Sequence, residues 1–304
     1  MIIKSKLYGA VLGLIGAILF AGKAIIIKWI YLNHEIKTLP LLTLRMLFSM
    51  PFYIYILLKV ERDSPMKLQN KEKISLLSVG LLGYYLASFL DFKGLEYISA
   101  TLERLILFIY PTLVLVISAI FFKRKITKVQ AIAVLLTYIG IVIAFVPDMK
   151  MQYQNDILLG TFFIFLSALC YALYLIGSGE LVKKLGTQRM TSYALIVSCI
   201  AVIIHFIIAD GSSLLKYDQE IYLLCFIMAV FSTVIPSFLV AESIKRIGAS
   251  SVSILSTIGP IATILMATQI LEEVFTNWHM IGTFFIIGGV LFISLQKEEK
   301  NSNQ

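Results

Sequence analysis

Ten apolar runs of roughly 20 residues, the length that crosses the hydrocarbon core of a bilayer, follow one another along the chain. Hydrophobic residues make up 59% of the sequence and charged residues only 14%, a balance that a soluble domain of this size could not bury. The runs lack the alternation of a membrane β-barrel, so they predict an all-α membrane protein with ten transmembrane helices. We expect the spans at residues 7–27, 38–58, 74–91, 101–122, 128–146, 157–177, 191–209, 221–240, 248–270 and 278–295.

Positive charges lie mostly on one side of these spans. With a cytoplasmic N-terminus, 18 of the 26 lysines and arginines fall in cytoplasmic loops and five in loops on the other side. Cytoplasmic loops of membrane proteins carry such an excess, so both termini are predicted to be cytoplasmic. This distribution accounts for the net charge of +8 without a nucleic-acid partner.

The chain contains an internal repeat. Residues 88–145 align with residues 237–294 without a gap, and ten aligned residues are identical. The turn Lys123-Arg124-Lys125 of the first copy corresponds to the acidic turn Glu272-Glu273 of the second. This exchange of charge is expected when duplicated halves have opposite orientations in a membrane.

Five spans in each half is an odd number, so the second half must enter the membrane in the opposite orientation. We predict two inverted five-helix repeats, residues 1–147 and 156–296, joined by the polar stretch Pro147–Asp156. Inverted repeats recur in secondary transporters, whose substrate site lies near the membrane midplane between the repeats.

Two prolines indicate where such a site would lie. Pro111 and Pro260 occupy equivalent mid-span positions, and each removes one backbone hydrogen bond from its helix. Paired breaks of this kind mark the binding region of a transporter. The predicted substrate pathway comprises both prolines and five nearby aromatic or hydroxyl residues: Tyr110, Tyr171, Tyr174, Ser253 and Thr257. Packing by the aromatic rings and hydrogen bonds from the hydroxyls to their own helices are the alternatives.

Charged side chains inside a membrane are costly and indicate function. On the predicted topology, five of them lie in the outer half of the first repeat: Lys23, Arg45, Asp91, Glu103 and Arg104. Opposite residues 101–104 the second repeat carries mainly serines. We predict that the five charges form an outer gate of ion pairs, and proton coupling through one of the carboxylates is left open.

A stripe of small residues runs along the first span. Gly9, Gly13, Ala17 and Ala21 recur every four residues and would let another helix approach closely. We expect intramolecular packing on this stripe, with a moving gate interface or a dimer seam as the alternatives.

Residues with metal-binding or catalytic potential are scattered. Cys170, Cys199 and Cys225 lie within spans and have no CxxC spacing, and the three histidines have no ligand partners at metal-site spacing. No Ser-His-Asp or HExxH pattern is present either. We therefore expect no metal, no cofactor and no enzyme activity.

Several motifs follow one another in a defined order along nearly the whole chain. They are Lys28 after the first span, Pro40 and Arg45 at the second, residues 95–100 leading to Pro111, residues 244–249 leading through Pro260 to Glu273, and Gly282, Gly288 and Gly289. In this order and spacing the chain resembles the EamA-type ten-helix transporters of the drug/metabolite transporter (DMT) superfamily. Members of that family usually have glutamate at the turn after the fourth span, where this chain has Arg124.

The resemblance implies a bacterial inner-membrane carrier of small metabolites, often an exporter of amino acids or drugs, with a central cavity between the repeats. We therefore predict a secondary active transporter that exports amino-acid-like or drug-like solutes by alternating access. Its partners would be the substrate, the lipid bilayer and a proton or another counter-ion, and it would be a monomer or a homodimer. A channel or facilitator without ion coupling is the main alternative, and an intramembrane enzyme and a structural scaffold are the others.

Overall fold

The computed structural model describes residues 2–121, 123, 126–150, 156–247, 252 and 255–302, and every regular element within these ranges is a helix. The first half contains α1 (Ile2–Asn33), α2 (Thr38–Asp63), α3 (Asn70–Gly80), the π-helix η1 (Leu81–Leu86), α4 (Ala87–Leu95), α5 (Ala100–Leu107), α6 (Tyr110–Phe121) and α7 (Lys128–Lys150). The second half contains α8 (Ile157–Leu185), α9 (Thr187–Ala209), α10 (Gln219–Ala229), the π-helix η2 (Val230–Val234), α11 (Ile235–Ile247), α13 (Ile258–Ile270) and α14 (Asn277–Ser302).

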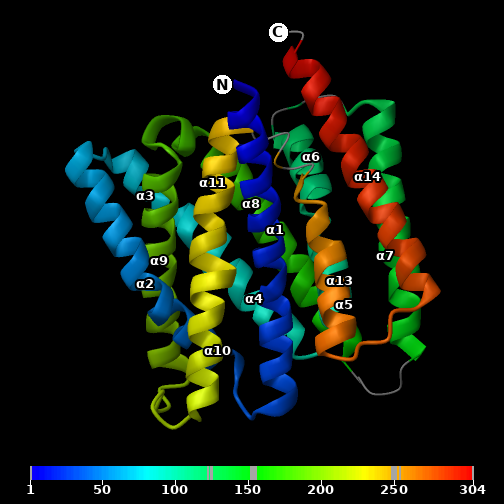
Figure 1. Cartoon of the computed structure of the whole chain (residues 1–304), viewed down its shortest axis with the longest axis horizontal. Coiled ribbons are helices and arrows are strands. Elements are labelled where there is room, and N and C mark those ends of the chain that lie inside the picture. The colour runs from blue at the N-terminus through cyan, green and yellow to red at the C-terminus, as the bar shows by residue number, and fades with distance from the viewer. Residues whose placement is uncertain are drawn as a thin grey trace.

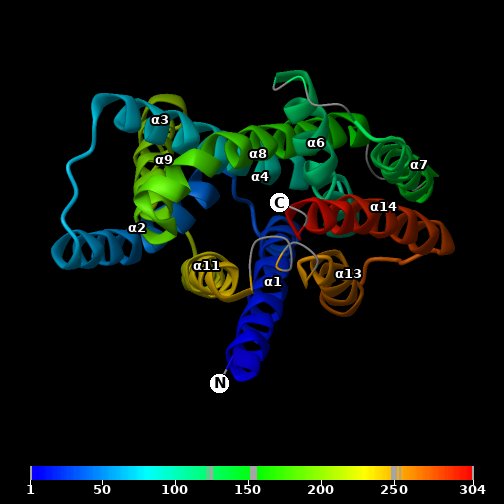
Figure 2. The same ribbon diagram turned by 90° about the horizontal axis from the view of Figure 1, so that it is seen from above.

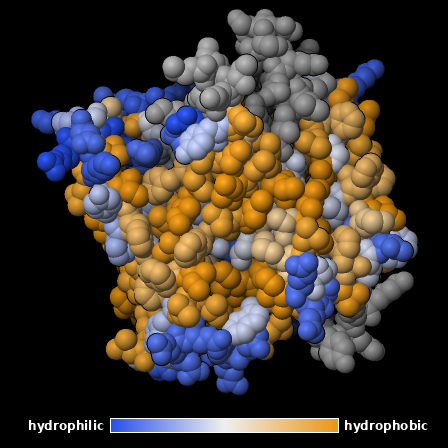
Figure 3. Space-filling view, viewed as in Figure 1, coloured by the Kyte–Doolittle hydropathy of each residue, from blue (hydrophilic) through white to orange (hydrophobic). Residues whose placement is uncertain are grey.

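The described helices match the predicted spans. Eight helical stretches are long and apolar enough to cross a membrane, and two shorter apolar helices, Ile258–Ile270 and Asn277–Phe292, occupy the ninth and tenth expected spans. Hydrophobic side chains cover the middle of the surface in Figure 3, and hydrophilic ones gather near its two ends. A helical bundle satisfies its backbone hydrogen bonds internally, as a lipid environment demands. The prediction of an all-α membrane protein is confirmed.

Most helices extend a few residues beyond the predicted spans. In the first repeat, α7 continues through Pro147 to Lys150, so the helix extends into the stretch that was expected to join the two repeats. Near the end of a helix a proline costs one backbone hydrogen bond, so the helix can continue past it. Residues 248–251, 253 and 254 of the predicted ninth span lie outside the described residues.

Both termini lie at the same end of the bundle. In Figure 1, α1 begins and α14 ends at the top, and the α1–α2 and α9–α10 loops lie at the bottom. We name these the terminal end and the distal end. With an even number of spans the chain must return to its starting side, so this placement agrees with the predicted topology.

Two π-helical segments occupy equivalent positions in the two halves. When the repeat alignment is extended toward the N-terminus, η1 aligns with η2. Each lies in the middle of an otherwise α-helical span, between α3 and α4 in the first half and between α10 and α11 in the second. Segments of π-helix are rare and occur frequently at functional sites. Sequence reasoning did not predict them.

The predicted mid-span breaks are also present at equivalent positions. The fourth span is interrupted by a turn at residues 108–109 and the ninth by a turn at residues 256–257, in each case just before the mid-span proline. The loops that follow share a second irregularity, because Lys123 and Glu272 both have a positive φ, of 51° and 54°. The two halves therefore share backbone geometry as well as sequence.

Close packing of α7 against α14 follows the same symmetry. The two helices lie side by side along one edge of the bundle (Figure 2). A Cβ atom at Gly289 would lie 2.6 Å from the Ala133 carbonyl oxygen, and one at Gly140 would lie 2.7 Å from the Gly282 carbonyl oxygen. The repeat alignment pairs Gly140 with Gly289 and Ala133 with Gly282, so it exchanges the two contacts. This is the geometry of an inverted repeat.

The small-residue stripe of α1 packs inside the molecule, as expected. A Cβ atom at Gly13 would lie 2.7 Å from Ser243 Oγ of α11, and this hydroxyl donates a 2.7 Å hydrogen bond to the Gly9 carbonyl oxygen. Ala17 and Ala21 are buried farther along the same helix, which also packs against α13. The stripe thus brings α1 close to helices of the second repeat.

Candidate functional site

Four tyrosines meet near the middle of the bundle, and we name them the tyrosine cluster. The ring centroids of Tyr110 and Tyr171 are 5.0 Å apart, those of Tyr171 and Tyr174 are 5.5 Å apart, and those of Tyr174 and Tyr84 are 5.0 Å apart. The Tyr84 and Tyr174 hydroxyl oxygens are 3.0 Å apart and share a hydrogen bond. Three of the four were predicted for the substrate pathway, and the structure adds Tyr84 from η1.

Two backbone irregularities position these rings. Gly83 lies against the Tyr174 ring so closely that a Cβ atom there would overlap with it, which leaves glycine as the residue that fits. The break before Pro111 allows α6 to begin at Tyr110, and the Ile109 carbonyl oxygen accepts hydrogen bonds from the Thr112 backbone and side chain. The local interruptions of both spans thus shape the same cluster.

The predicted pathway residues of the second repeat belong to a different set of helices. Thr257 immediately precedes α13, and Pro260 is buried in the first turn of that helix. Ser253 lies outside the described residues. Because α13 packs against α1 and α5, these residues are placed on helices other than η1, α6 and α8, which carry the tyrosine cluster.

Four of the five predicted gate charges lie together toward the distal end, and we name them the distal charge cluster. Lys23 Nζ of α1 is 2.5 Å from Asp91 Oδ2 of α4, and the Asp91 side chain is only 2% exposed. Glu103 of α5 is fully buried, and its Oε2 atom is 3.9 Å from Nε of the adjacent Arg104. The cluster brings two cations and two carboxylates together in a region from which most water is excluded, and Lys23–Asp91 is its one close ion pair among the described residues.

The Arg104 guanidinium connects this cluster to both repeats. Its Nε atom donates a 3.0 Å hydrogen bond to Thr263 Oγ1 of α13. Its Nη2 atom donates to the carbonyl oxygens of Phe20 and Ala21 in α1, at 3.3 Å and 3.5 Å. These partners hold Arg104 between α1 and α13, so its closest contacts are with neutral oxygens.

Arg45 differs from the expected network. It makes no ion pair with any described carboxylate: its Nε atom donates a 3.1 Å hydrogen bond to Thr233 Oγ1 of η2, and its guanidinium carbon lies 5.3 Å from the centre of the Phe92 ring. Thr233 in turn donates to the Met228 carbonyl oxygen, five residues back along the widened helix. Arg45 therefore joins α2 to the π-helix of the second repeat.

A carboxylate that was not among the predicted gate residues caps a helix across the repeats. Glu273, in the α13–α14 loop, accepts hydrogen bonds from the backbone N–H groups of Ala100 and Thr101, at 2.7 Å and 3.0 Å. These N–H groups open α5, where the helix dipole also favours an anion. In the repeat alignment this acidic residue corresponds to the basic Arg124, and this difference in charge is the sequence feature that could have singled out Glu273.

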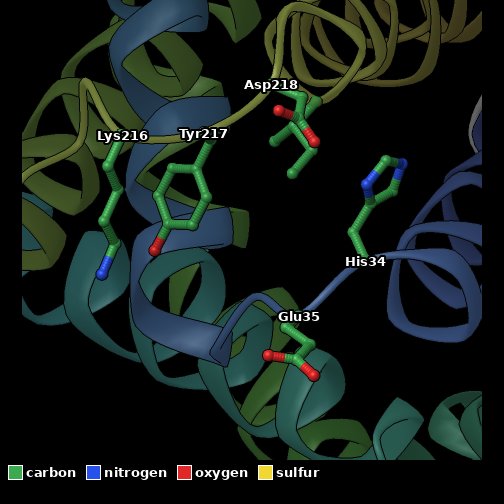
Figure 4. A pocket seen from close by; sticks show the side chains of 6 residues that line it. His34, Glu35, Lys216, Tyr217 and Asp218 are labelled. Carbon is green, nitrogen blue, oxygen red and sulfur yellow. The ribbon is translucent and has the colours of Figure 1, made fainter.

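A small depression of about 270 Å³ lies at the distal end, between the α1–α2 loop and the α9–α10 loop (Figure 4). Its lining comprises His34, Glu35, Lys216, Tyr217, Asp218 and Ile221. Burial raises the pKa of the Tyr217 hydroxyl above its ordinary value, so this group remains a neutral donor. Sites for small molecules usually measure roughly 300–1,000 Å³, so this depression is small for a substrate site.

Comparison with known proteins shows that both repeats match the same family model. The model of the EamA-like transporter family matches residues 7–146 and 158–295. The uncharacterized transporter YcbK of Bacillus subtilis (strain 168) is 32% identical over 306 residues, which cover 98% of this chain and 97% of that protein. The uncharacterized transporter YyaM of the same organism is 24% identical over 227 residues, or 74% of each chain.

A protein crystal structure with 14% sequence identity superposes with a TM-score of 0.64, over 95% of this chain and 98% of that chain, and supports the fold alone. The family match covers both halves, so the membrane fold and a role in transport are shown. The chain belongs to the EamA-like transporter family, and it is a multi-pass membrane transporter and not an enzyme.

Proposed function

We propose that this transporter is a secondary active carrier that exports small amino-acid-like or drug-like solutes by alternating access. The observation that carries the proposal is the pairing of helix interruptions. The π-helices η1 and η2 occupy equivalent mid-span positions in the inverted halves. The breaks at residues 108–109 and 256–257 correspond to each other in the same way. Interrupted helices of opposite orientation provide two backbone regions that can exchange conformations around a central site.

The tyrosine cluster is the proposed substrate surface. Tyr84, Tyr110 and Tyr171 are only partly buried, although their rings lie between the helices of the bundle. Aromatic faces stack on flat apolar groups and attract organic cations, and the phenol hydroxyls can hydrogen-bond to polar groups of a ligand. Amino-acid-like and drug-like solutes combine such features.

The distal end is the proposed outer gate. Lys23–Asp91, the Arg104 hydrogen bonds to α1 and α13, and the Glu273 cap on α5 all connect helices there. The excess of positive charge in the loops of the terminal end supports a cytoplasmic location of that end. In this arrangement, the structure is a state in which the outer side is closed.

Counterflow in vesicles tests the carrier mechanism. Purified protein is reconstituted into liposomes that are loaded with unlabelled L-phenylalanine or the membrane-impermeant dication methyl viologen, and uptake of the same labelled solute is measured. A carrier gives uptake that saturates with concentration and is accelerated by solute on the opposite side. Uptake that rises linearly and shows no counterflow would identify a channel instead, and no uptake of either probe would count against the proposed substrate classes.

Truncation of Tyr171, a partly buried member of the cluster, is expected to weaken transport of an aromatic or cationic probe. Removing one stacking ring costs about 0.5–1.5 kcal/mol, which corresponds to a KM increase of roughly two- to tenfold in Tyr171→Ala. Tyr55→Ala is the matched control, because Tyr55 is 68% exposed on the outside of α2. Equal KM values for the two variants would remove the tyrosine cluster from the pathway.

Removal of the Glu273 charge is expected to open the distal end. Glu273→Gln weakens two hydrogen bonds to the start of α5, and a loss of about 1.4 kcal/mol would shift the equilibrium roughly tenfold toward the outward-open state. The readout is labelling of Thr101→Cys by a membrane-impermeant maleimide, in a chain whose three native cysteines are replaced by alanine. Glu272→Gln, at the exposed neighbouring position, should leave labelling unchanged. Labelling that responds equally to both substitutions would exclude a gating role for the cap.

A further inference from the structure

Two buried carboxyl groups face each other in the distal charge cluster. Asp91 of α4 is 2% exposed and Glu103 of α5 is fully buried. Their carboxyl groups lie within hydrogen-bonding reach of each other, although they belong to different helices. Two ionised carboxylates at this range would repel each other in an interior that screens charge poorly.

The hydrogen bonds that the two carboxyl groups receive indicate how this contact is stabilised. Neither Glu103 oxygen, nor Asp91 Oδ1, accepts a hydrogen bond from an N–H or O–H group of the described residues. Lys23 binds the other Asp91 oxygen, and Arg104 Nε is 3.9 Å from Glu103, beyond hydrogen-bonding distance. One proton held between the two carboxyl groups would supply the missing donor, because a protonated carboxyl donates an O–H while its partner accepts.

We infer that Asp91 and Glu103 form a proton-binding site, and that this proton is the coupling ion of the carrier. The inference rests on the proposed function for its transport role, but the bound proton itself follows from the geometry of the pair. Glu103 is the group that carries the proton, because Lys23 already neutralises Asp91 through a 2.5 Å contact. The Glu103 O–H then donates to Asp91.

The charged groups around Glu103 are few. They are Lys23 of α1, Asp91 of α4 and Arg104 of α5. α13 carries no charged residue, the first charge of α8 is Glu180 near the terminal end, and α7 has no charge between Val129 and Pro147. Arg45 of α2 lies near Asp91, and Glu273 caps the first turn of α5. Exchange of the proton therefore changes the balance of a small set of charges.

Arg104 provides a means of releasing the proton. In this structure its guanidinium is held by carbonyl oxygens of α1 and by Thr263 of α13. If the distal end opens and both α1 and α13 move away from α5, these hydrogen bonds are lost and Arg104 can turn to the adjacent Glu103. A water molecule then takes the proton from the Glu103 O–H, and the resulting carboxylate pairs with Arg104. Protonation of Glu103 from water reverses the step, so proton and guanidinium compete for one carboxylate.

Infrared spectroscopy tests the bound proton without any substrate. Purified protein in lipid at neutral pH should show a protonated carboxyl C=O band that shifts in D₂O. The band should disappear in Glu103→Gln and change frequency or disappear in Asp91→Asn. Glu272→Gln, an exposed carboxylate at the distal end, is the matched control and should retain it. Absence of the band in the unmodified protein, or its persistence in Glu103→Gln, would overturn the inference. If Glu103→Gln fails to fold, the unmodified protein and Asp91→Asn still decide the question.

A second measurement tests coupling. In vesicles that transport a probe, an imposed pH gradient should drive accumulation by the unmodified protein, whereas in Glu103→Gln uptake should fall to the level seen without a gradient. Accumulation that still follows the gradient in Glu103→Gln would refute coupling at this site. Failure of every probe to be transported would instead contradict the proposed carrier function, and the infrared result would remain the test of the proton.

Discussion

Replacement of Lys23 by methionine is expected to destabilise the protein by about 3–5 kcal/mol, because it leaves the buried Asp91 without its charged partner. Methionine preserves most of the apolar length of the side chain, so the loss reports mainly on the missing ammonium group. The measurement is the unfolding free energy of purified protein in mixed micelles titrated with a denaturing detergent. The variant Lys59→Met, at an exposed position in the last turns of α2, should lose almost nothing.

A double substitution distinguishes the loss of the whole ion pair from the cost of leaving one buried charge unpaired. Lys23→Met combined with Asp91→Leu removes both members of the pair, and replacing a buried ion pair by apolar groups is often neutral or stabilising. We therefore expect the double variant to be more stable than Lys23→Met alone. If the single variant loses less than about 1 kcal/mol, as exposed ion pairs do, then the Lys23–Asp91 contact does not hold α1 to α4.

Leucine at position 289 is expected to disrupt the contact between α7 and α14, whereas leucine at the adjacent position 288 should be tolerated. A Cβ atom at Gly289 would lie 2.6 Å from the Ala133 carbonyl oxygen and overlap with Thr137, but one at Gly288 would meet nothing within 4 Å. Overpacking typically costs about 1–3 kcal/mol, and a backbone oxygen has little freedom to move aside, so the loss should lie at the upper end of this range or above it.

The two leucine variants share the same change of composition and helix propensity, so their difference isolates the packing term. Unfolding free energy and the yield of monodisperse protein in detergent are the readouts. Equal losses in Gly288→Leu and Gly289→Leu would show that α7 and α14 are not in this close contact. The corresponding substitution Gly140→Leu should behave like Gly289→Leu, because the repeat alignment exchanges the two positions.

Hydropathy and charge in the sequence predict most of the architecture. Each span has to satisfy its own backbone in lipid, so length and composition locate helices largely independently of their neighbours. The breaks at Pro111 and Pro260 were predictable for a similar local reason, because a proline removes a specific hydrogen bond wherever it lies in a helix. The π-helical segments carry no such marker, and neither η1 nor η2 was predicted.

The candidate site was only partly predictable. Buried charges draw attention by their cost, and this brought Lys23, Asp91, Glu103 and Arg104 into consideration from sequence. Their pairing was not predictable, since it depends on the rotation and depth of α1, α4 and α5 relative to one another. Arg45 illustrates the limit, because its partner is the hydroxyl of Thr233 in the other repeat.

Sequence by itself determined what each segment can be: apolar helices of membrane length, two halves of opposite charge pattern, and breaks at equivalent prolines. Tertiary structure decided which side chains meet. Contacts such as Tyr84 with Tyr174, or Glu273 with the first turn of α5, join residues far apart in the chain. Hydropathy depends on one residue at a time, whereas a hydrogen bond or a ring contact depends on the relative placement of two helices to within about an ångström, and only packing of the whole bundle fixes that placement.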